Sequence, residues 1–76
     1  MRPDEKKALK TLGENIRRER LRVKVSQERL GYRTRLDRTY ISGIERGQRN
    51  CTVLKIGLIA SALGVDSATL LTGVKL

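Results

Sequence analysis

The sequence predicts an all-α fold of five short helices. Apolar residues recur every three or four positions along the chain, and no segment shows the alternating pattern of a strand. Residues that cap helices precede these apolar segments, and glycines follow two of them. A chain of 76 residues suits one compact domain spanning residues 1–76, with no volume for a catalytic cavity beside its core.

The first helix is expected to run from about Asp4 to Arg22. Pro3 precedes it and acidic residues occupy its first turn, both typical of a helix start. Apolar side chains at helical spacing form its buried stripe, namely Leu9, Leu12 and Ile16.

Two further helices follow, separated by a short turn. Ser26 can accept a hydrogen bond from a free backbone N–H, so it begins a second helix that continues to about Arg33. Asp37 is an equally good cap for a third helix, which ends before Gly47. Two caps about eleven residues apart, joined by a tight turn, predict a helix-turn-helix over about 26–46.

The last two helices lie in the remaining third of the chain. Thr52 is expected to begin a fourth helix that ends at Leu63, with Gly64 as its left-handed cap. Asp66 is expected to cap a short fifth helix that continues to Leu71.

The fourth helix is apolar on two nearly opposite faces. One face contains Ile56, Ile59, Ala60 and Leu63, and the other contains Leu54, Leu58 and Ala62. A small monomer can cover only one face, so the second predicts a homodimer, with a better-wrapped monomer as the alternative. The dimerisation region is expected at about 53–76, with these interface residues: Leu54, Leu58, Leu70, Leu71 and Val74.

The chain is strongly basic, with 17 Lys and Arg, eight Asp and Glu, and a formal net charge of +9. Residues 1–50 hold 15 basic against seven acidic residues, whereas residues 51–76 hold two against one. A positive charge concentrated around a helix-turn-helix indicates double-stranded DNA as the partner, although Lys and Arg also keep small domains in solution.

The composition argues against catalysis and metal binding. The chain has no His and a single cysteine, Cys51, so it lacks a zinc-ligand cluster, an internal disulfide and a His-based triad. We therefore expect a protein that is not an enzyme and needs no metal or cofactor, with Cys51 as a packing residue. Since no segment approaches the roughly 18 apolar residues of a spanning helix and no signal-peptide core is present, we expect no membrane contact and a cytoplasmic location.

The third helix carries the chemistry expected to read DNA. Arg38 can donate two hydrogen bonds to guanine O6 and N7, and Thr39 can offer a hydroxyl or methyl to a base edge. Gln27 is expected to hold a phosphate with help from the helix dipole. The base-reading candidates are Arg38, Thr39, Ser42 and Arg49. The phosphate-binding candidates are Ser26, Gln27, Arg35, Tyr40, Arg46 and Asn50, although the residues alone do not separate the two roles for Ser42, Arg49, Tyr40 and Asn50.

Several segments carry a family resemblance that extends from about Leu12 to Leu71. The segments Ser26–Glu28, Leu36–Ser42, Ile44–Gly47 and Ile59–Val65 resemble the Cro and lambda-repressor type of helix-turn-helix domain, the XRE family. Within that class, the string Asp37–Asn50 is most similar to the controller proteins of type II restriction–modification systems.

The resemblance implies a homodimer bound to a pseudo-palindromic operator. Such a protein regulates its own operon, activates endonuclease expression after the methyltransferase has protected the host DNA, and brings in RNA polymerase as a further partner. It also implies an ion pair between Arg20 and Glu45. The sequence departs from the family at Arg35, where a left-handed turn favours Gly or Asn. The alternative functions are a phage, plasmid or chromosomal repressor of the same fold, and a small antitoxin or protein-interaction module.

Overall fold

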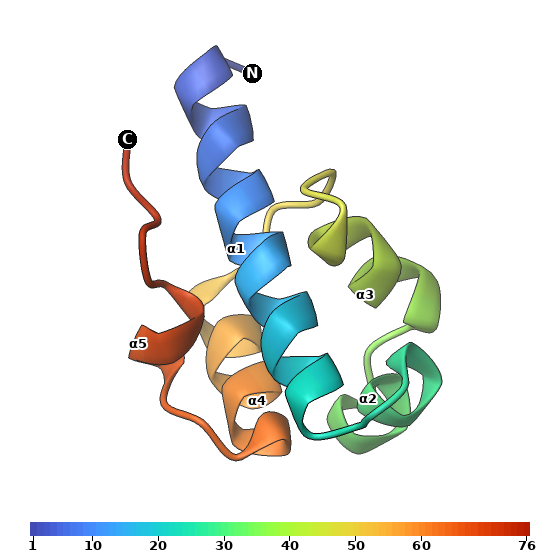
Figure 1. The fold of residues 1–76 in the computed structure, drawn as a ribbon. Coiled ribbons are helices and arrows are strands. Elements are labelled where there is room, and N and C mark those ends of the chain that lie inside the picture. The colour runs from blue at the N-terminus through green and yellow to red at the C-terminus, as the bar shows by residue number, and fades with distance from the viewer.

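Five helices make up the chain in the computed structural model, which describes residues 1–76 (Figure 1). They are α1 (Pro3–Arg22), α2 (Gln27–Thr34), α3 (Arg38–Glu45), α4 (Val53–Leu63) and α5 (Ser67–Leu70). There is no strand, so the predicted all-α class is confirmed. None of the helices is both long and apolar enough to cross a membrane.

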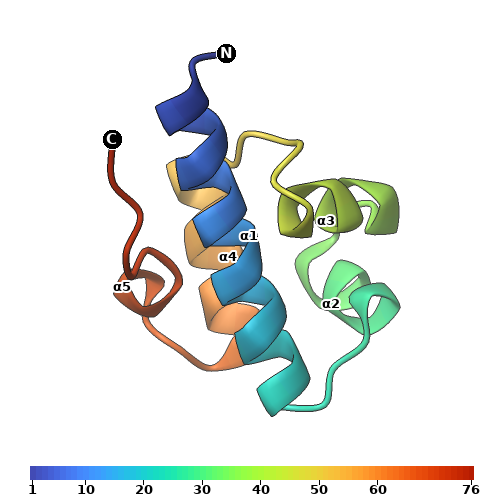
Figure 2. The same ribbon diagram turned by 45° about the horizontal axis from the view of Figure 1, so that its top comes forward.

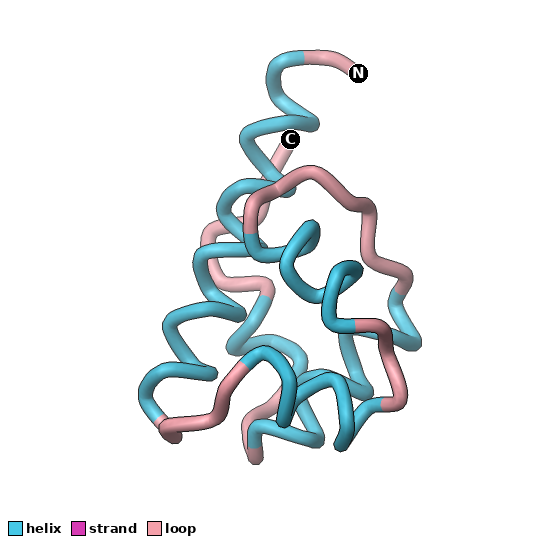
Figure 3. Tube along the Cα trace, turned by 90° about the vertical axis from the view of Figure 1, so that its right-hand side faces the viewer, coloured by secondary structure: helices cyan, strands magenta, loops and turns pink.

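The long helix α1 organises the domain by packing against α3, α4 and α5. Figure 2 shows α4 behind α1, with α2 and α3 on one side of this pair and α5 on the other. The Cα trace of Figure 3 shows that the two chain ends lie near the same end of the molecule. The helix-turn-helix and the C-terminal segment therefore occupy opposite sides of α1.

Each helix contributes at least one large side chain to a single core. Leu12 and Ile16 of α1 are buried as expected, whereas Leu9 is only half-buried. The largest fully buried side chains are Ile16, Leu30, Ile41, Ile44, Ile59 and Leu70.

The side chains of Ser26, Asp37 and Thr52 cap α2, α3 and α4. Each accepts a hydrogen bond of 2.7–3.2 Å from a backbone N–H in the first turn of its helix. Asp66 occupies the predicted N-cap position of α5, but its carboxylate makes no capping bond, and the N–H of Thr69 donates instead to the backbone carbonyl of Asp66. All four predicted residues therefore stand at helix starts, and three of them cap with their side chains.

The turn between α2 and α3 has the left-handed geometry that favours Gly or Asn, although Arg35 stands there. Arg35 has φ 59° and ψ 26°, a conformation that costs a residue other than glycine about 1–2 kcal/mol. Thr34 helps to hold this turn, since its hydroxyl donates to the carbonyl of Leu30 at 2.7 Å and accepts from the N–H of Leu36 at 3.3 Å. Local hydrogen bonds thus compensate for an unfavourable residue.

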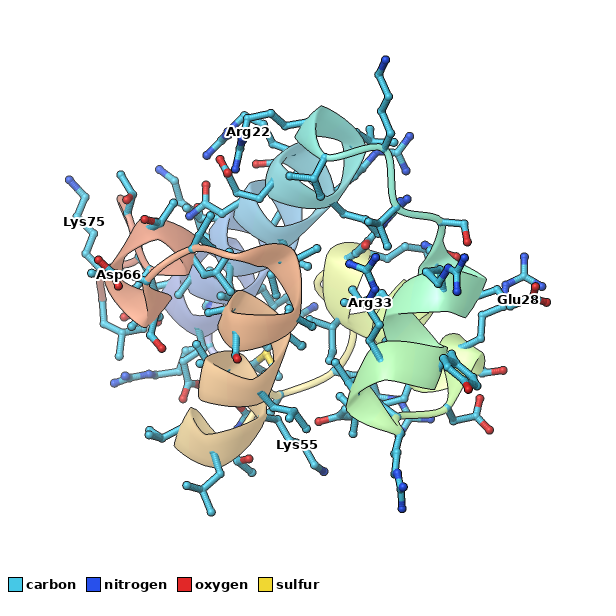
Figure 4. The ribbon with its side chains drawn as sticks, turned by 90° about the horizontal axis from the view of Figure 1, so that it is seen from below. Arg22, Glu28, Arg33, Lys55, Asp66 and Lys75 are labelled. Carbon is cyan, nitrogen blue, oxygen red and sulfur yellow. The ribbon has the colours of Figure 1, made fainter.

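The second apolar face of α4 is largely uncovered in the single chain. Leu54 is 85% exposed and Leu58 is 42% exposed. Ala62 is half-buried and packs against the core. The side chain of Arg33, labelled in Figure 4, donates from α2 to the carbonyl of Ala62 at 3.2 Å. The exposed part of this face is therefore the ridge formed by Leu54 and Leu58.

The C-terminal segment corrects one expected interface residue. Leu70 is completely buried, because the single turn of α5 directs it into the core. A second chain cannot reach Leu70, which is therefore a core residue. Leu71 is 41% exposed and Val74 is half-buried, so both remain accessible.

Candidate nucleic-acid interface

The start of α2 and the outer face of α3 meet in a shallow hollow. Its lining comes from residues that the sequence had singled out one by one, namely Gln27, Arg38, Thr39, Ser42 and Arg46. The caps at Ser26 and Asp37 direct the starts of both helices toward this surface, where free N–H groups and helix dipoles favour an anion.

An adjoining hollow extends the same surface onto α1. It is lined by Arg17, Arg20, Ser26, Gln27, Glu28 and Arg38. Arg17 was not among the residues predicted from the sequence. Because Arg17 stands three positions before Arg20, the two side chains share one face of α1, and this spacing was the signal that could have identified it.

Behind the hollows, Arg20 of α1 and Glu45 at the end of α3 form the ion pair that the family resemblance implied. The Nε and Nη2 atoms of Arg20 donate to the two carboxylate oxygens of Glu45 at 2.7 and 2.9 Å. Their side chains are only 7% and 2% exposed, and Nη1 of Arg20 donates to the carbonyl of Val25 at 2.9 Å. The pair thereby ties α1, the segment before α2 and α3 together.

The same carboxylate orients Gln27. The Nε2 atom of Gln27 donates to Oε1 of Glu45 at 3.1 Å. This bond uses one of the two amide hydrogens and leaves the second hydrogen and the carbonyl oxygen for another partner. Gln27 is thus held in a defined orientation at the capped start of α2.

The two leading base-reading candidates are exposed at the start of α3. Arg38 takes part in none of the ion pairs of the structure, and its planar guanidinium is exposed. Thr39 uses its backbone N–H for the Asp37 cap, while its side chain faces solvent. Both side chains can therefore meet a ligand without breaking an ion pair.

Ser42 and Arg46 are already engaged with one another. Nη1 of Arg46 donates to the hydroxyl of Ser42, and Nε donates to Oε1 of Gln48 at 3.2 Å. These contacts hold the guanidinium of Arg46 along the end of α3. A ligand that binds at this position therefore contacts the side chains of Ser42 and Arg46 together.

A second cluster forms where α3 meets the segment before α4. The hydroxyl of Tyr40 donates to the carbonyl of Asn50 at 3.1 Å, so its only hydrogen is occupied. The Nζ atom of Lys55 lies 4.6 Å from the centroid of the Tyr40 ring, and Cζ of Arg49 lies 6.0 Å from it. Tyr40 thus holds two cations and the loop backbone, and Lys55 is a basic neighbour that the sequence analysis did not include.

Two other residues stand outside these clusters. Arg35 lines a separate hollow on the turn, next to Tyr32 and Leu36. Cys51 is buried in the core cluster, and this burial raises the pKa of its thiol, with Lys55 acting in the opposite direction. A buried neutral thiol fits the packing role expected for Cys51.

Comparisons with known proteins agree with this arrangement. A family model described as helix-turn-helix matches residues 16–70, which is most of the chain. The chain is 47% identical over 60 residues to the control protein C.BamHI of Bacillus amyloliquefaciens, across 78% of this chain and 74% of that protein.

Solved structures give the same result. The restriction–modification controller protein C.AhdI from Aeromonas hydrophila superposes with a TM-score of 0.80 and 39% identity, covering 82% of this chain and 94% of that one. The controller protein C.Esp1396I, solved as a tetramer in complex with its natural 35 base-pair operator, superposes with a TM-score of 0.77 and 40% identity over 86% of both chains. The chain therefore belongs to the helix-turn-helix family of restriction–modification controller proteins.

Proposed function

We propose that this protein controls a restriction–modification operon by binding as a homodimer to a pseudo-palindromic operator. Its family consists of DNA-binding transcription regulators. The observation that carries the proposal for this chain is the pair Arg38 and Thr39, exposed at the start of α3 beside the oriented amide of Gln27.

In this proposal α3 reads bases in the major groove. The exposed guanidinium of Arg38 forks onto O6 and N7 of a guanine, and Thr39 contacts a neighbouring base edge. Ser42 and Arg49 remain further candidates for base contacts. The bond between Ser42 and Arg46 limits how freely that hydroxyl can turn toward a base.

Phosphate binding is assigned to the start of α2 and to the residues on either side of α3. Gln27 donates its second amide hydrogen to a phosphate, supported by the helix dipole and the cap at Ser26. We add Arg17 to this group, since it lines the same surface from α1. The other candidates are Arg35, Tyr40, Arg46 and Asn50. Tyr40 can donate to a phosphate only after releasing the carbonyl of Asn50.

The homodimer is assigned to the uncovered ridge of α4 and the segment after α5. Leu54, Leu58, Leu71 and Val74 are among the accessible apolar residues there. Two-fold pairing through this face is expected to set the recognition helices about 34 Å apart, one turn of duplex. Leu58→Asp should then give a monomer in sedimentation experiments, whereas Tyr32→Asp, at a position 80% exposed on α2, should leave the dimer intact.

At the promoter, the bound protein is proposed to regulate its own operon and to activate endonuclease expression, with RNA polymerase as its partner. This places its action in the cytoplasm, where the chromosome lies. The proposal assigns no catalytic reaction to the chain.

The deciding experiment is a titration of fluorescent duplexes with the protein at physiological salt. Its own upstream region should bind about 10³-fold more tightly than a scrambled duplex of equal length. The logarithm of the affinity should fall steeply with the logarithm of salt concentration, because phosphate contacts release counterions. Equal affinities for the two duplexes would reject the proposal and favour a protein-interaction module instead.

A further inference from the structure

Asn15 is a buried polar residue of α1 that the DNA-binding surface does not use. It is 4% exposed, and its Nδ2 atom donates to the carbonyl oxygens of Leu70 at 2.8 Å and Thr72 at 2.7 Å. Its Oδ1 atom accepts from Nη2 of Arg18 at 2.7 Å. The side chain of Asn15 therefore donates both amide hydrogens to the C-terminal segment.

The two carbonyl groups that Asn15 binds lie on either side of Leu71. The N–H of Leu71 donates to the carbonyl of Ser67 at 3.2 Å, and its carbonyl accepts from the N–H of Val74 at 3.0 Å. The backbone around Leu71 is thus held on both sides while its side chain stays 41% exposed.

Leu71 belongs to the face proposed for self-association. Helix α5 packs against α4 on the side of α1 away from the helix-turn-helix (Figures 1 and 2). A helix of a single turn such as α5, with four residues, makes too few internal hydrogen bonds to be stable alone and needs attachment to other elements. Asn15 supplies that attachment from the middle of α1.

We propose that Asn15 positions the self-association face by holding the segment around Leu71 in the conformation that a second copy of the chain binds. The inference rests on the proposed homodimer. If the segment were in place only about a third of the time, the apparent dissociation constant of the dimer would rise about tenfold, because both copies must be competent and the constant scales with the inverse square of the competent fraction. Asn15 would thus set dimer affinity without touching the partner.

Asn15→Asp tests this role directly, because it changes the amide and little else. Asn15→Asp keeps the size of the side chain and an oxygen for Arg18, so it leaves no cavity. It removes both N–H donors and sets a negative charge against the carbonyl oxygens of Leu70 and Thr72. Ile16→Val is the matched control, since it weakens the core at the next position of α1 without altering any hydrogen bond to the C-terminal segment.

The test measures dimer dissociation constants by sedimentation for the wild-type chain, Asn15→Asp, Ile16→Val and Leu58→Asp. We expect Asn15→Asp to raise the constant about tenfold and Ile16→Val to leave it unchanged. Amide hydrogen exchange at Leu71 and Val74 should accelerate in Asn15→Asp, while exchange within α3 stays as in the wild type. If Asn15→Asp does not fold, Asn15→Ser, which keeps one donor, should raise the constant by less than tenfold, and an unchanged constant would overturn the role of Asn15.

The outcomes separate this inference from the proposed dimer. If Leu58→Asp is monomeric but Asn15→Asp pairs as tightly as the wild type, the role of Asn15 is overturned and the dimer stands. If Ile16→Val weakens pairing as much as Asn15→Asp, general stability explains the effect and the inference is also overturned. A wild-type chain that stays monomeric, or an unchanged dimer in Leu58→Asp, removes the proposed interface and the inference with it.

Discussion

Gly13 of α1 lies directly against the backbone of Ile44 at the end of α3. A methyl group at position 13 would stand 2.6 Å from the carbonyl oxygen of Glu45 and closer still to that of Ile44. The absence of a side chain therefore lets α3 approach α1 closely enough for Glu45 to reach Arg20. This contact explains a glycine that is otherwise unfavourable inside a long helix.

Gly13→Ala should therefore destabilise the protein despite the better helix propensity of alanine. Overpacking typically costs about 1–3 kcal/mol, against a propensity gain of about 1 kcal/mol. Gly57→Ala in α4 is the control, because its new methyl group would meet only the hydroxyl of Ser67, at 3.8 Å. Urea unfolding should show a loss of stability for Gly13→Ala and a gain for Gly57→Ala. A gain for both variants would show that α1 and α3 can move apart at no cost in stability.

Removing Glu45 should be the most damaging single change at the site. Glu45→Ala strands a buried guanidinium, which should lower the free energy of unfolding by about 3–5 kcal/mol. Arg22→Ala is the comparison, since Arg22 pairs with Glu19 at 2.8 Å but is 57% exposed, and its loss should change stability by less than about 1 kcal/mol. Chemical denaturation measures both, and similar losses would contradict the burial argument.

Substitutions of Arg38 and of Gln27 should affect operator binding in different ways. Arg38→Ala should cost about 1–3 kcal/mol at the cognate operator and flatten the preference for one base pair. Gln27→Ala should weaken cognate and altered operators by similar factors, because a phosphate contact carries no sequence information. One competition assay over single-base operator variants measures both effects, with circular dichroism as the folding control. A uniform loss for Arg38→Ala and a changed preference for Gln27→Ala would refute the proposed reading by α3.

Arg35→Gly should stabilise the protein while weakening DNA binding. Glycine accepts the left-handed conformation freely, so the variant should gain about 1 kcal/mol in unfolding free energy. If Arg35 contacts a phosphate, the slope of log affinity against log salt should fall by about one. Lys24→Gly, at the other basic residue of positive φ (60°), should gain similar stability with an unchanged slope. An unchanged slope for Arg35→Gly would remove Arg35 from the interface.

Much of the architecture could be predicted because helix starts depend on local chemistry. The caps at Ser26, Asp37 and Thr52 need only a side-chain oxygen and the backbone of the next turn, so the sequence carried enough information to locate α2, α3 and α4. Asp66 shows the limit of that reasoning, since its short helix satisfies the same N–H group with a backbone carbonyl.

The burial and the partners of individual side chains depend on which surfaces pack together. The spacing of apolar residues along the chain does not contain that information. From the sequence, Leu70 and Leu71 were equivalent apolar candidates for the interface. Only the docking of α5 buries Leu70 and leaves Leu71 exposed. Likewise, the carboxylate of Glu45 orients Gln27 only after the chain brings them together from 18 positions apart. The sequence by itself determined the helices and the residue types available to bind DNA, because those follow from local hydrogen bonding and charge. Only the tertiary structure decided their partners and exposure, because these depend on close packing between distant segments.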